Sequence, residues 1–475
     1  MLSAKIKGKR VTVVGLARSG AGAANLLSRL GAEVTVTDMK AEEELKGYVQ
    51  QLDSSVRLAL GGHPENVFAG ADMLVISPGV PSDIQPVMRA KSNGVPVIGE
   101  LELAYQAVAS QEFKTVSRTR FLGVTGTNGK STTTALLDFM MKKGGAHTVV
   151  GGNIGYALTE EIRKAVIMED KAIDFIVAEI SSFQLETIQD FRPEVSALIN
   201  ITPDHLDRYR SLEDYGNAKA RIFENQTGDD SLVLNRDDPE TMKIESEKLR
   251  VKNDYPKVFY FSRKQEVAGL YLKDGIVYCN IPGLPHAPCP MPLIRAGEIK
   301  IKGVHNLENA MAASAMALLA GCPVTAVTDS LKEFSGLEHR LEFVRELDGV
   351  RYYNDSKGTN VGAVMKSLES FTGPVILIAG GRDKAGDFSV LRTLVKERVK
   401  AAVLIGEAAE KIRGAFKDFT KTFMASDLRD AVETARSSAG KGDVVLLSPA
   451  CASFDMFRNF EDRGRQFKKI VMEMA

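Results

Sequence analysis

The chain lacks features that identify several protein classes. It has only four cysteines (Cys279, Cys289, Cys322 and Cys451), and none of them form a C-x-x-C pair or have the spacing of a zinc site. We therefore expect a reducing, cytoplasmic setting. Acidic and basic residues each number 61, so the formal net charge is zero. Without an excess of one sign there is no overall field to attract nucleic acid or an anionic membrane, and we expect neither as a partner.

Long apolar runs are also missing. The longest, residues 310–320, is too short to span a bilayer and predicts a buried helix. Near the N-terminus, the apolar run at 11–14 is too short for the core of a signal peptide. No solenoid-type repeat or low-complexity tract is present. A chain of 475 residues with 44% hydrophobic and 26% charged residues then indicates a soluble globular protein of about three domains.

Apolar strand patterns alternate with helical patterns along the chain, which is typical of parallel α/β sheets. We expect three domains, at 1–109, 110–336 and 337–475, with a polar linker near 110–120. Asp274-Gly275 predicts a hairpin, residues 282–292 a proline-rich loop, and residues 306–319 a helix. The expected strands are 11–14, 34–37, 73–76, 95–99, 121–124, 175–179, 196–201, 232–235, 350–354, 375–379, 402–405 and 443–447.

The most informative motif is GVTGTNGKSTTTALL at residues 123–137. An apolar strand leads into a glycine-bearing turn, and Lys130 and Ser131 lie where the next helix begins. In this geometry backbone N–H groups bind phosphate oxygens, the lysine reaches the outer phosphates, and the serine hydroxyl binds Mg²⁺. Val124 occupies the position of the first glycine of the general phosphate-loop pattern, so an ordinary glycine turn is the alternative.

Further polar residues in the middle segment follow apolar strands. Glu179 ends one strand and is a candidate Mg²⁺ ligand, the alternative being a carboxylate in solvent. His205 lies among carboxylates in a loop and is either a second metal ligand or an exposed histidine. Lys219 lies on a predicted helix, and its local pattern is that of a surface lysine.

The N-terminal turn Gly15-x-Ala17-x-x-Gly20 resembles a dinucleotide-binding fingerprint whose middle glycine is alanine. Because Ala17 would crowd a tightly bound pyrophosphate, a dehydrogenase is disfavoured. The diphosphate of a nucleotide substrate can still bind, and a turn without a ligand is the alternative. Asp38 can accept from a base or ribose, or act as a cap or strand-end charge. The turn beginning Ser77-Pro78-Gly79 is interpreted as rigid rather than ligand-binding.

Three predicted strands of the last segment end in small, polar or charged residues. These ends are Asp355-Ser356-Lys357, residues 380–384 and residues 448–454. Since the carboxyl ends of parallel strands meet at one edge of a sheet, we expect a ligand crevice there. Cys451 is interpreted as a packed residue rather than a nucleophile.

These motifs together resemble the Mur ligases of bacterial cell-wall synthesis. They are GTNGKST (126–132), AEISSFQLE (178–186), NITPDHLDRY (200–209), HNLENA (305–310), EHRLE (338–342), NDSKGTN (354–360) and LSPACASFDMF (447–457). The resemblance covers essentially the whole chain. It implies an α/β fold of three domains: a Rossmann-like N-terminal domain for a uridine nucleotide, a P-loop ATPase-like central domain, and a Rossmann-like C-terminal domain for an amino acid.

The resemblance also implies a reaction. ATP, with a pair of Mg²⁺ ions, would phosphorylate the carboxylate of UDP-N-acetylmuramoyl-L-alanine, and the amine of D-glutamate would attack the acyl phosphate. SSFQLE, NDSK and SPACASFD favour D-glutamate as the acceptor, and the Asp-Asn-Pro-Arg run of a diaminopimelate-adding relative is absent. A monomeric enzyme of the cytoplasm is expected.

Roles for individual residues follow from the resemblance. Lys130, Glu179, His205 and Lys219 would be catalytic, with Ser131, Glu179, His205 and a carbamylated Lys219 as metal ligands. ATP would contact Gly126, Thr127, Asn128, Gly129, Lys130, Ser131, Thr132, Asn306, Asn309, Arg340 and Asp355. The nucleotide substrate would contact Arg18, Ser19, Asp38, Ser77, Gly79, Asn153, Ser181 and Gln184. D-Glutamate would contact Thr359, Lys384, Ser453, Phe454 and Phe460.

Three other functions stay open at this point. A nucleotide-dependent oxidoreductase would use the N-terminal turn but leaves the phosphate loop and Glu179 unexplained. A non-catalytic nucleotide-binding protein would bind ATP without turnover. Within the family, another amino-acid-adding Mur-type ligase or a folylpolyglutamate synthase-like ligase would use a different acceptor.

Overall fold

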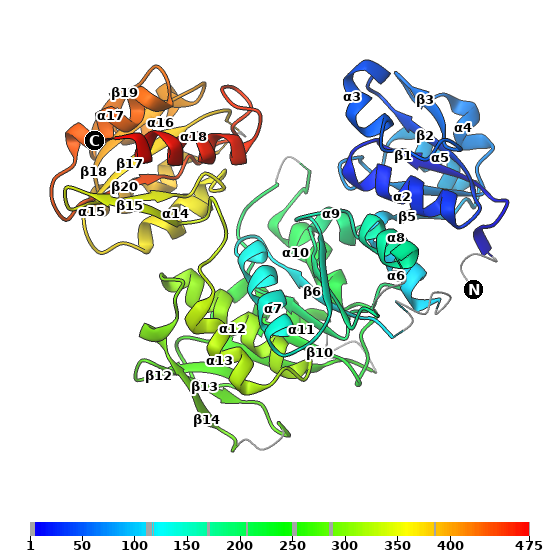
Figure 1. The fold of residues 1–475 in the computed structure, drawn as a ribbon, viewed down its shortest axis with the longest axis horizontal. Helices are drawn as coiled ribbons and strands as arrows, with labels where there is room; N and C mark the ends of the chain where they lie inside the picture. Colours follow the sequence, from blue (N-terminus) through cyan, green and yellow to red (C-terminus); the bar gives the residue numbers. More distant parts are fainter. Residues whose placement is uncertain are drawn as a thin grey trace. The chain divides into compact units, whose positions relative to one another are not determined.

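The computed structural model describes residues 5–110, 116, 118–168, 172–205, 208–248, 254–284, 288–383 and 386–474. The chain divides into two compact units. The first comprises residues 1–201, 205–298 and 309–332, and the second residues 202–204, 299–308 and 333–475. The first unit contains two β-sheets and the second one, and helices cover each sheet (Figure 1).

The N-terminal sheet has five parallel strands in the order β3-β2-β1-β4-β5. The order reverses at β1, so the crevice outside its carboxyl end is the expected ligand position of such a fold. The strands are β1 Arg10–Val14, β2 Glu33–Asp38, β3 Arg57–Leu60, β4 Met73–Ile76 and β5 Val97–Gly99. The helices are α2 Arg18–Arg29, α3 Glu42–Val49, α4 Glu65–Ala69, α5 Gln85–Ser92 and α6 Glu100–Ala109. The sequence patterns predicted four of these strands and missed β3.

The central sheet has nine strands in the order β14-β13-β12-β11-β10-β9-β6-β8-β7. It is parallel from β7 to β12 and antiparallel from β12 to β14. The hairpin at Asp274-Gly275 is confirmed, whereas β14 begins inside the predicted proline-rich loop. The strands are β6 Arg120–Thr125, β7 Thr148–Gly152, β8 Phe175–Glu179, β9 Val195–Leu198, β10 Ser231–Asn235, β11 Lys257–Ser262, β12 Gly269–Lys273, β13 Ile276–Asn280 and β14 Met291–Arg295.

The helices of this middle region include the predicted buried helix, α12. They are α7 Lys130–Lys143, α8 Leu158–Met168, α9 Ser182–Leu185, α10 Leu212–Ala220, α11 Pro239–Lys248, α12 Val304–Leu319 and α13 Val324–Glu333, with 3₁₀ turns at Arg221–Phe223 and Ala296–Glu298. α2 packs closely on α8, because a Cβ on Gly22 would lie 2.8 Å from Thr159 Oγ1.

Helix α6 fixes the N-terminal sheet to the central one. Its Glu102 is fully buried, and the carboxylate accepts backbone N–H groups of Gln189 (2.8 Å), Asp190 (3.0 Å) and Phe191 (3.0 Å). Glu100 accepts the backbone N–H of Thr159 at 2.8 Å, at the start of α8. A buried carboxylate that accepts several backbone N–H groups, as Glu102 does, holds its partners firmly in place.

The C-terminal sheet has six strands in the order β15-β16-β20-β17-β18-β19. Only β15 is antiparallel to its neighbour. The strands are β15 Glu342–Leu347, β16 Val350–Asn354, β17 Val375–Gly380, β18 Val399–Ile405, β19 Lys421–Met424 and β20 Val444–Leu447. The helices are α14 Val361–Glu369, α15 Arg392–Arg398, α16 Ala409–Phe416, α17 Leu428–Ser438 and α18 Phe460–Glu473, with a 3₁₀ turn at Phe388–Leu391. The sequence predicted β16, β17, β18 and β20 and missed the edge strands β15 and β19.

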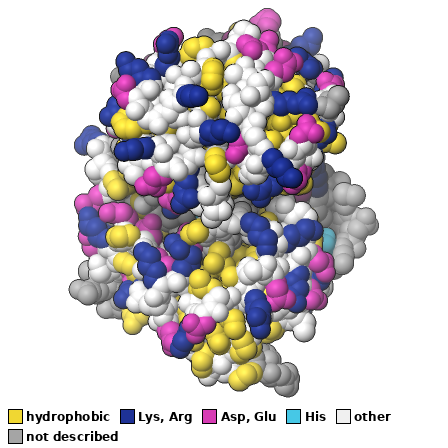
Figure 2. Space-filling view, turned by 90° about the vertical axis from the view of Figure 1, so that its left-hand side faces the viewer, with side chains coloured by type: hydrophobic (Ala, Val, Ile, Leu, Met, Phe, Trp, Pro, Cys, Tyr) yellow, Lys and Arg dark blue, Asp and Glu magenta, His cyan; other side chains and the backbone are white. Residues whose placement is uncertain are grey.

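The surface carries charges of both signs. On the face in Figure 2, basic and acidic side chains are interspersed, as the equal numbers of the two kinds predict. Among the described residues, every helix is too short or too polar to cross a bilayer.

Candidate active site

The phosphate-loop motif forms the turn between β6 and α7. Gly126 and Gly129 have φ angles of +152° and +87°, which residues with a side chain rarely adopt. A Cβ on Gly129 would lie 2.1 Å from Asn309 Oδ1 of α12, so a side chain here would displace Asn309. Gly129 caps α7, and the first turn of that helix begins with Lys130, Ser131 and Thr132. The N–H groups in the first turn of an α-helix point along the helix axis, so the start of α7 is a position that suits phosphate oxygens.

Two side chains hold the loop in shape. Lys130 Nζ donates to the carbonyls of Gly126 (2.9 Å) and Thr127 (2.8 Å). Asn200 Oδ1 accepts the N–H of Asn128 at 2.8 Å, while its Nδ2 donates to the Asn128 carbonyl at 2.9 Å. The sequence motif included Asn200, but nothing in its spacing indicated this bracing role.

Glu179 ends β8 and has one unused oxygen. The residue is 2% exposed, and Oε1 accepts from Asn153 Nδ2 at 2.6 Å. Oε2 is buried and has no hydrogen-bond partner among the residues that the structure describes. A buried carboxylate oxygen without a donor is costly unless a cation neutralises it, so this atom fits a metal ion.

Lys219 is not the surface lysine that its local pattern suggested. It is 1% exposed, and Nζ donates to the Gly126 carbonyl at 2.8 Å. The ammonium also lies 4.4 Å from the centre of the Tyr215 ring. The helix α10 therefore delivers this lysine to the same carbonyl that Lys130 contacts.

His205 has a left-handed backbone conformation, with φ of 55°. Its ring contacts those of Phe183 (4.8 Å between centroids) and Tyr215 (6.2 Å). The His205 carbonyl accepts the N–H groups of Arg208 and Tyr209, whose side chains both bind Glu186. Within the described part of the chain, no three His, Cys, Asp or Glu side chains form a metal cluster. A metal ion would need further oxygen ligands besides Glu179 and His205.

A cavity of about 1050 Å³ lies within the first unit and collects most of the predicted nucleotide-substrate residues. Its lining includes all but one of them: Arg18, Ser19, Asp38, Ser77, Gly79, Asn153 and Gln184. They come from the strand ends of the N-terminal sheet, from the start of α2, from the loop after β7 and from α9. The remaining one, Ser181, caps α9 and accepts the N–H of Gln184 at 3.3 Å.

The glycine turn after β1 is tightly packed. A Cβ on Gly20 would lie 2.0 Å from the Gly15 carbonyl oxygen, which also accepts from Ser77 Oγ at 2.8 Å. Asp38 is engaged as well, since its Oδ2 accepts the N–H of Leu16 at 2.6 Å. Ser77 and Asp38 thus shape the turn from neighbouring strands, and Arg18 reaches the Gly155 carbonyl beyond it.

The four predicted ATP residues outside the loop have different local settings. Asn309 faces the loop, with its Oδ1 3.4 Å from Thr133 Oγ1. Asn306, Arg340 and Asp355 belong to the second unit. There, Asn306 Nδ2 donates to the Lys302 carbonyl at 2.8 Å. Burial raises the pKa of the Asp355 carboxyl, against hydrogen bonds from Ser367 and Ser448 and the charge of Arg340.

The three polar strand ends of the C-terminal sheet do meet. Asp355 Oδ2 accepts from Ser448 Oγ at 2.7 Å, and the N–H of Gly380 donates to the Pro449 carbonyl at 2.8 Å. Of the predicted acceptor-site residues, Ser453 is buried, Phe454 is 63% exposed and Thr359 precedes α14. Lys384 lies outside the described residues.

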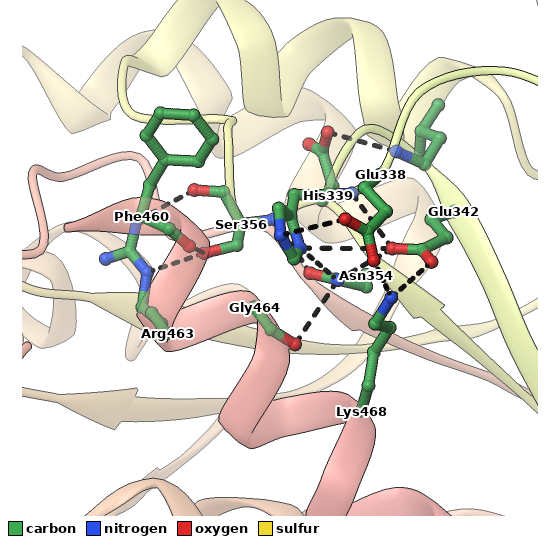
Figure 3. A network of polar contacts seen from close by, with 11 residues as sticks. Glu338, His339, Glu342, Asn354, Ser356, Phe460, Arg463, Gly464 and Lys468 are labelled. Atoms are coloured by element: carbon green, nitrogen blue, oxygen red, sulfur yellow. Dashed lines mark hydrogen bonds and ion pairs between the residues drawn. The ribbon is translucent and has the colours of Figure 1, made fainter.

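Helix α18 binds two of these strand ends, and Figure 3 shows its contacts with Ser356. Arg463 is fully buried; it donates to Ser356 Oγ at 3.0 Å and to the Ser356 carbonyl at 2.8 Å. It also reaches the Cys451 carbonyl at 3.3 Å. Burial lowers the pKa of Arg463 to about 10. Phe460, the first residue of the helix, accepts from Ser356 Oγ through its carbonyl at 2.8 Å. The sequence motif did not indicate the bracing role of Arg463.

A second group in Figure 3 surrounds His339 of the EHRLE motif. His339 Nδ1 lies 2.8 Å from Asn354 Nδ2, and its backbone N–H donates to Glu342 at 2.9 Å. Lys468 of α18 binds Glu338 and Glu342. The motif that precedes β15 is thereby tied to the same helix as the strand ends.

Comparison with known families matches almost the whole chain. Residues 9–99 match the N-terminal domain described as Mur ligase MurD-like, residues 124–317 the Mur ligase middle domain, and residues 339–451 the glutamate ligase domain of Mur ligases. These three ranges correspond to the three sheets.

Individual relatives agree with this. The chain is 46% identical over 473 residues to a protein of Geotalea daltonii named UDP-N-acetylmuramoylalanine–D-glutamate ligase, covering 99% of both chains. It is 44% identical to the protein of that name from Thermoanaerobacter pseudethanolicus, again over 99% of both. Among solved structures, a pseudomurein peptide ligase type C from Methanothermus fervidus has a TM-score of 0.59 at 17% identity, covering 98% of this chain and 100% of that one. The MurF ligase from Thermotoga maritima, in complex with ADP, also has a TM-score of 0.59 at 17% identity, covering 100% and 97%. At an identity this low, these structural matches show a common fold and no more.

Proposed function

The chain belongs to the Mur ligase family, and from this premise we propose that it joins D-glutamate to UDP-N-acetylmuramoyl-L-alanine at the expense of ATP. One observation carries the proposal. A phosphate loop and a cavity lined by Arg18, Asp38, Asn153 and Gln184 lie in one compact unit, and Asn153 donates to the Glu179 carboxylate. The cavity for the nucleotide is thus linked by a hydrogen bond to the candidate metal ligand. Relatives named for D-glutamate favour that acceptor over those of other family members.

The reaction must first activate the carboxylate of the nucleotide substrate. A carboxylate is a poor acyl donor, so an oxygen of the substrate carboxylate attacks the γ-phosphorus of ATP and ADP leaves. The amine of D-glutamate then attacks the acyl carbon, and the resulting tetrahedral species expels phosphate as the amide forms. Catalysis of phosphoryl transfer depends on positioning and on neutralising charge on the transferred group.

Residues of the phosphate loop supply much of that neutralisation. Lys130 would exchange the carbonyls of Gly126 and Thr127 for outer phosphate oxygens, and the N–H groups at the start of α7 would bind the others. Asn309 closes the loop from α12. Asn306, Arg340 and Asp355 are assigned to the remainder of ATP.

Mg²⁺, when bound, would act as a Lewis acid on the phosphate oxygens. The buried Oε2 of Glu179 supports such a site, with Ser131 and His205 as further ligands. Lys219 as an ammonium group can only donate. We infer that Lys219 is carbamylated: its neutral amine adds carbon dioxide and loses a proton, which gives a carboxylate-like ligand beside the loop.

The other substrate residues follow from the cavity and the C-terminal loops. Ser77 and Gly79 would bind the diphosphate side together with Arg18 and Ser19, and Ser181 would support the muramoyl side. D-Glutamate would bind at Thr359, Ser453, Phe454, Phe460 and Lys384. The proposed domains are 1–109, 110–336 and 337–475, in a monomer acting in the cytoplasm.

The proposal is tested by phosphate release from ATP and Mg²⁺ in the presence of UDP-N-acetylmuramoyl-L-alanine, with D-glutamate, L-glutamate, L-lysine or diaminopimelate supplied separately. We expect release that needs both the nucleotide and D-glutamate. Release with a different amino acid would keep the reaction and reject the acceptor. Release with none of them would reject the proposed function.

A further inference from the structure

The nucleotide cavity contains a polar side chain that no motif indicated. His63 follows β3, the strand that sequence patterns missed, and lines the cavity beside Asp38. Tyr48 of α3 and Met39, which is 67% exposed, complete this end of the lining. In a nucleotide-binding cavity an imidazole either packs against the ligand or forms a hydrogen bond with it, and the contacts of His63 decide between these roles.

The backbone holds His63 in a fixed position. The N–H of Gly62 donates to the Asp38 carbonyl at 3.0 Å, and the N–H of Gly61 donates to the Lys40 carbonyl at 2.8 Å. Gly61 and Gly62 both have positive φ angles, of 79° and 153°, which suit glycine. The loop after β3 is therefore joined to the loop after β2 at the carboxyl edge of the sheet.

The contacts of Thr37 define which ring nitrogen carries the proton. Thr37 Oγ1 donates to the Gly62 carbonyl at 3.0 Å, which uses its only hydrogen. His63 Nδ1 lies 3.0 Å from the same oxygen and must be the donor in that contact. Burial lowers the pKa of His63, against the opposing charge of Asp38, so the ring is neutral near pH 7. The lone pair is then on Nε2, to which none of the described residues is hydrogen-bonded.

Asp38, the acceptor that the sequence predicted, is already in use. Its Oδ2 accepts the N–H of Leu16 at 2.6 Å and its Oδ1 accepts that of Lys40 at 2.9 Å. These bonds fix the turn after β1 and the loop after β2. At this end of the cavity, Nε2 of His63 is thus a hydrogen-bond acceptor that the described residues of the neighbouring loops do not use.

The lining also orients the ligand. Asn153 and Gln184, from the central sheet, lie at the end proposed for the sugar, and α2 begins at Arg18 beside the glycine turn, where a diphosphate fits. The nucleoside is left with the end formed by Asp38, Met39, Tyr48 and His63. An aromatic ring and a thioether beside polar groups suit a flat base.

We propose that Nε2 of His63 accepts a hydrogen bond from the nucleoside half of the nucleotide substrate, from N3–H of the uracil or from a ribose hydroxyl. This rests on the proposed function, because it takes a uridine nucleotide as the occupant of the cavity. A uracil has a single ring N–H donor, at N3, and cytosine has none there. If that is the donor, His63 selects uridine over cytidine nucleotides.

Binding without turnover tests the inference directly. We would measure the Kd of UDP-N-acetylmuramoyl-L-alanine by calorimetry, without ATP, for the full chain and for His63→Phe and His63→Gln. Loss of one hydrogen bond of about 1.4 kcal/mol predicts a Kd about tenfold weaker for His63→Phe. His63→Gln keeps an acceptor and should recover part of the affinity. His147→Phe is the matched control, because His147 also contacts an oxygen through Nδ1 but lies outside the cavity lining.

Substrates changed at one atom identify the donor. Versions with N3-methyluracil, 2′-deoxyribose or 3′-deoxyribose should each bind the unaltered protein more weakly than the unmodified substrate does. The version that lacks the true donor should bind His63→Phe with the same Kd as the unmodified substrate. A Kd for His63→Phe within twofold of the unaltered protein, or losses that simply add for all three analogues, would overturn the inference. If the unaltered protein binds the nucleotide but releases no phosphate with any amino acid, the proposed function fails while the role of His63 is still decided.

Discussion

At the scale of single residues, the most unusual arrangement is a carbonyl shared by two lysines. Lys130 and Lys219 both donate to the Gly126 carbonyl, at 2.9 Å and 2.8 Å. Two ammonium groups this close repel each other, and Lys219 is almost completely buried. Converting Lys219 to a carbamate would replace the repulsion by attraction and provide an oxygen ligand for a cation. A lysine on a short helix gives no sequence signal for this, because its burial depends on where α10 packs.

We predict that Lys219→Ala loses at least about a hundredfold in kcat, since a charged ligand of the transition state is lost. Added acetate or formate should restore part of the activity by occupying the space of the carbamate. Lys243→Ala, which removes an exposed lysine from α11, is the control and should keep full activity. The measurement is phosphate release at saturating substrates. Full activity of the Lys219→Ala enzyme would show that catalysis needs no carbamate at this position.

A second residue-scale prediction concerns stability at acidic pH. Burial, with Arg340 and Lys366 nearby, lowers the pKa of His305 to about 3. The unfolded chain then binds a proton below pH 6.5 that the folded chain does not, so stability is complete above pH 6.5 and is lost as the pH falls towards 3. Between pH 7 and pH 5 the loss should be about 2 kcal/mol.

Urea unfolding at pH 7 and pH 5 measures this loss. His305→Asn keeps a polar partner for Ser370 but cannot titrate in this range, so its stability should fall by about 2 kcal/mol less between the two values. His147→Asn should behave like the unaltered chain. An equal loss in His305→Asn would show that other groups cause the acid sensitivity.

At the scale of elements, the junction of β6 and α7 depends on the backbone of one glycine. Gly129 and Gly145 stand at the two ends of α7 with similar φ angles, +87° and +91°. A Cβ on Gly129 would meet Asn309 Oδ1 at 2.1 Å, whereas one on Gly145 would have nothing within 4 Å. Comparing alanine substitutions at the two positions therefore distinguishes the effect of backbone strain from the effect of contact between the loop and Asn309.

We expect Gly145→Ala to lower the free energy of unfolding by about 1 kcal/mol and to leave ATP binding unchanged. Gly129→Ala should weaken ATP binding at least about tenfold, because Asn309 must move or the loop must open. Fluorescent ATP analogue titration measures the affinity, and thermal unfolding checks that both variants fold. Equal ATP affinities in the two variants would contradict the role given to the loop.

Helix α6 gives a second prediction at this scale. Glu102→Ala leaves the N–H groups of Gln189, Asp190 and Phe191 without their acceptor. At about 1 kcal/mol each, the free energy of unfolding should fall by about 3 kcal/mol. Glu65→Ala removes an exposed partner of Arg89 and should change it by less than about 0.5 kcal/mol. Urea unfolding that gave the same small change for both variants would contradict the account of α6.

The elements also show what the sequence could predict. Strands β4 and β8 contain apolar runs, β16 alternates buried and half-buried side chains, and the patterns located all three to the residue. The missed β3 and β19 are edge strands whose side chains are all exposed or half-buried, and their apolar runs are only two or three residues long. His63 was missed with β3, because the loop that carries it follows a strand that the patterns did not locate. The bracing by Asn200 and Arg463 depends on tertiary contacts that local spacing does not encode.

At the scale of the whole molecule, the three sheets repeat one principle. Each presents its polar residues at the carboxyl ends of parallel strands: Asp38 and Ser77 in the first, Glu179 in the second, and Asp355 and Ser448 in the third. This is where open α/β sheets bind ligands. A net charge of zero is consistent with recognition by such local groups rather than by an overall field.

The most direct test of the central claim follows one oxygen atom. UDP-N-acetylmuramoyl-L-alanine labelled with ¹⁸O in its carboxylate is incubated with ATP, Mg²⁺ and D-glutamate, and the masses of the phosphate and of the nucleotide product are measured. Because a carboxylate oxygen attacks the γ-phosphorus and leaves with phosphate, the account predicts one ¹⁸O in each phosphate released and a product heavier by one D-glutamyl residue. Unlabelled phosphate, or a nucleotide that gains no D-glutamate, would contradict it.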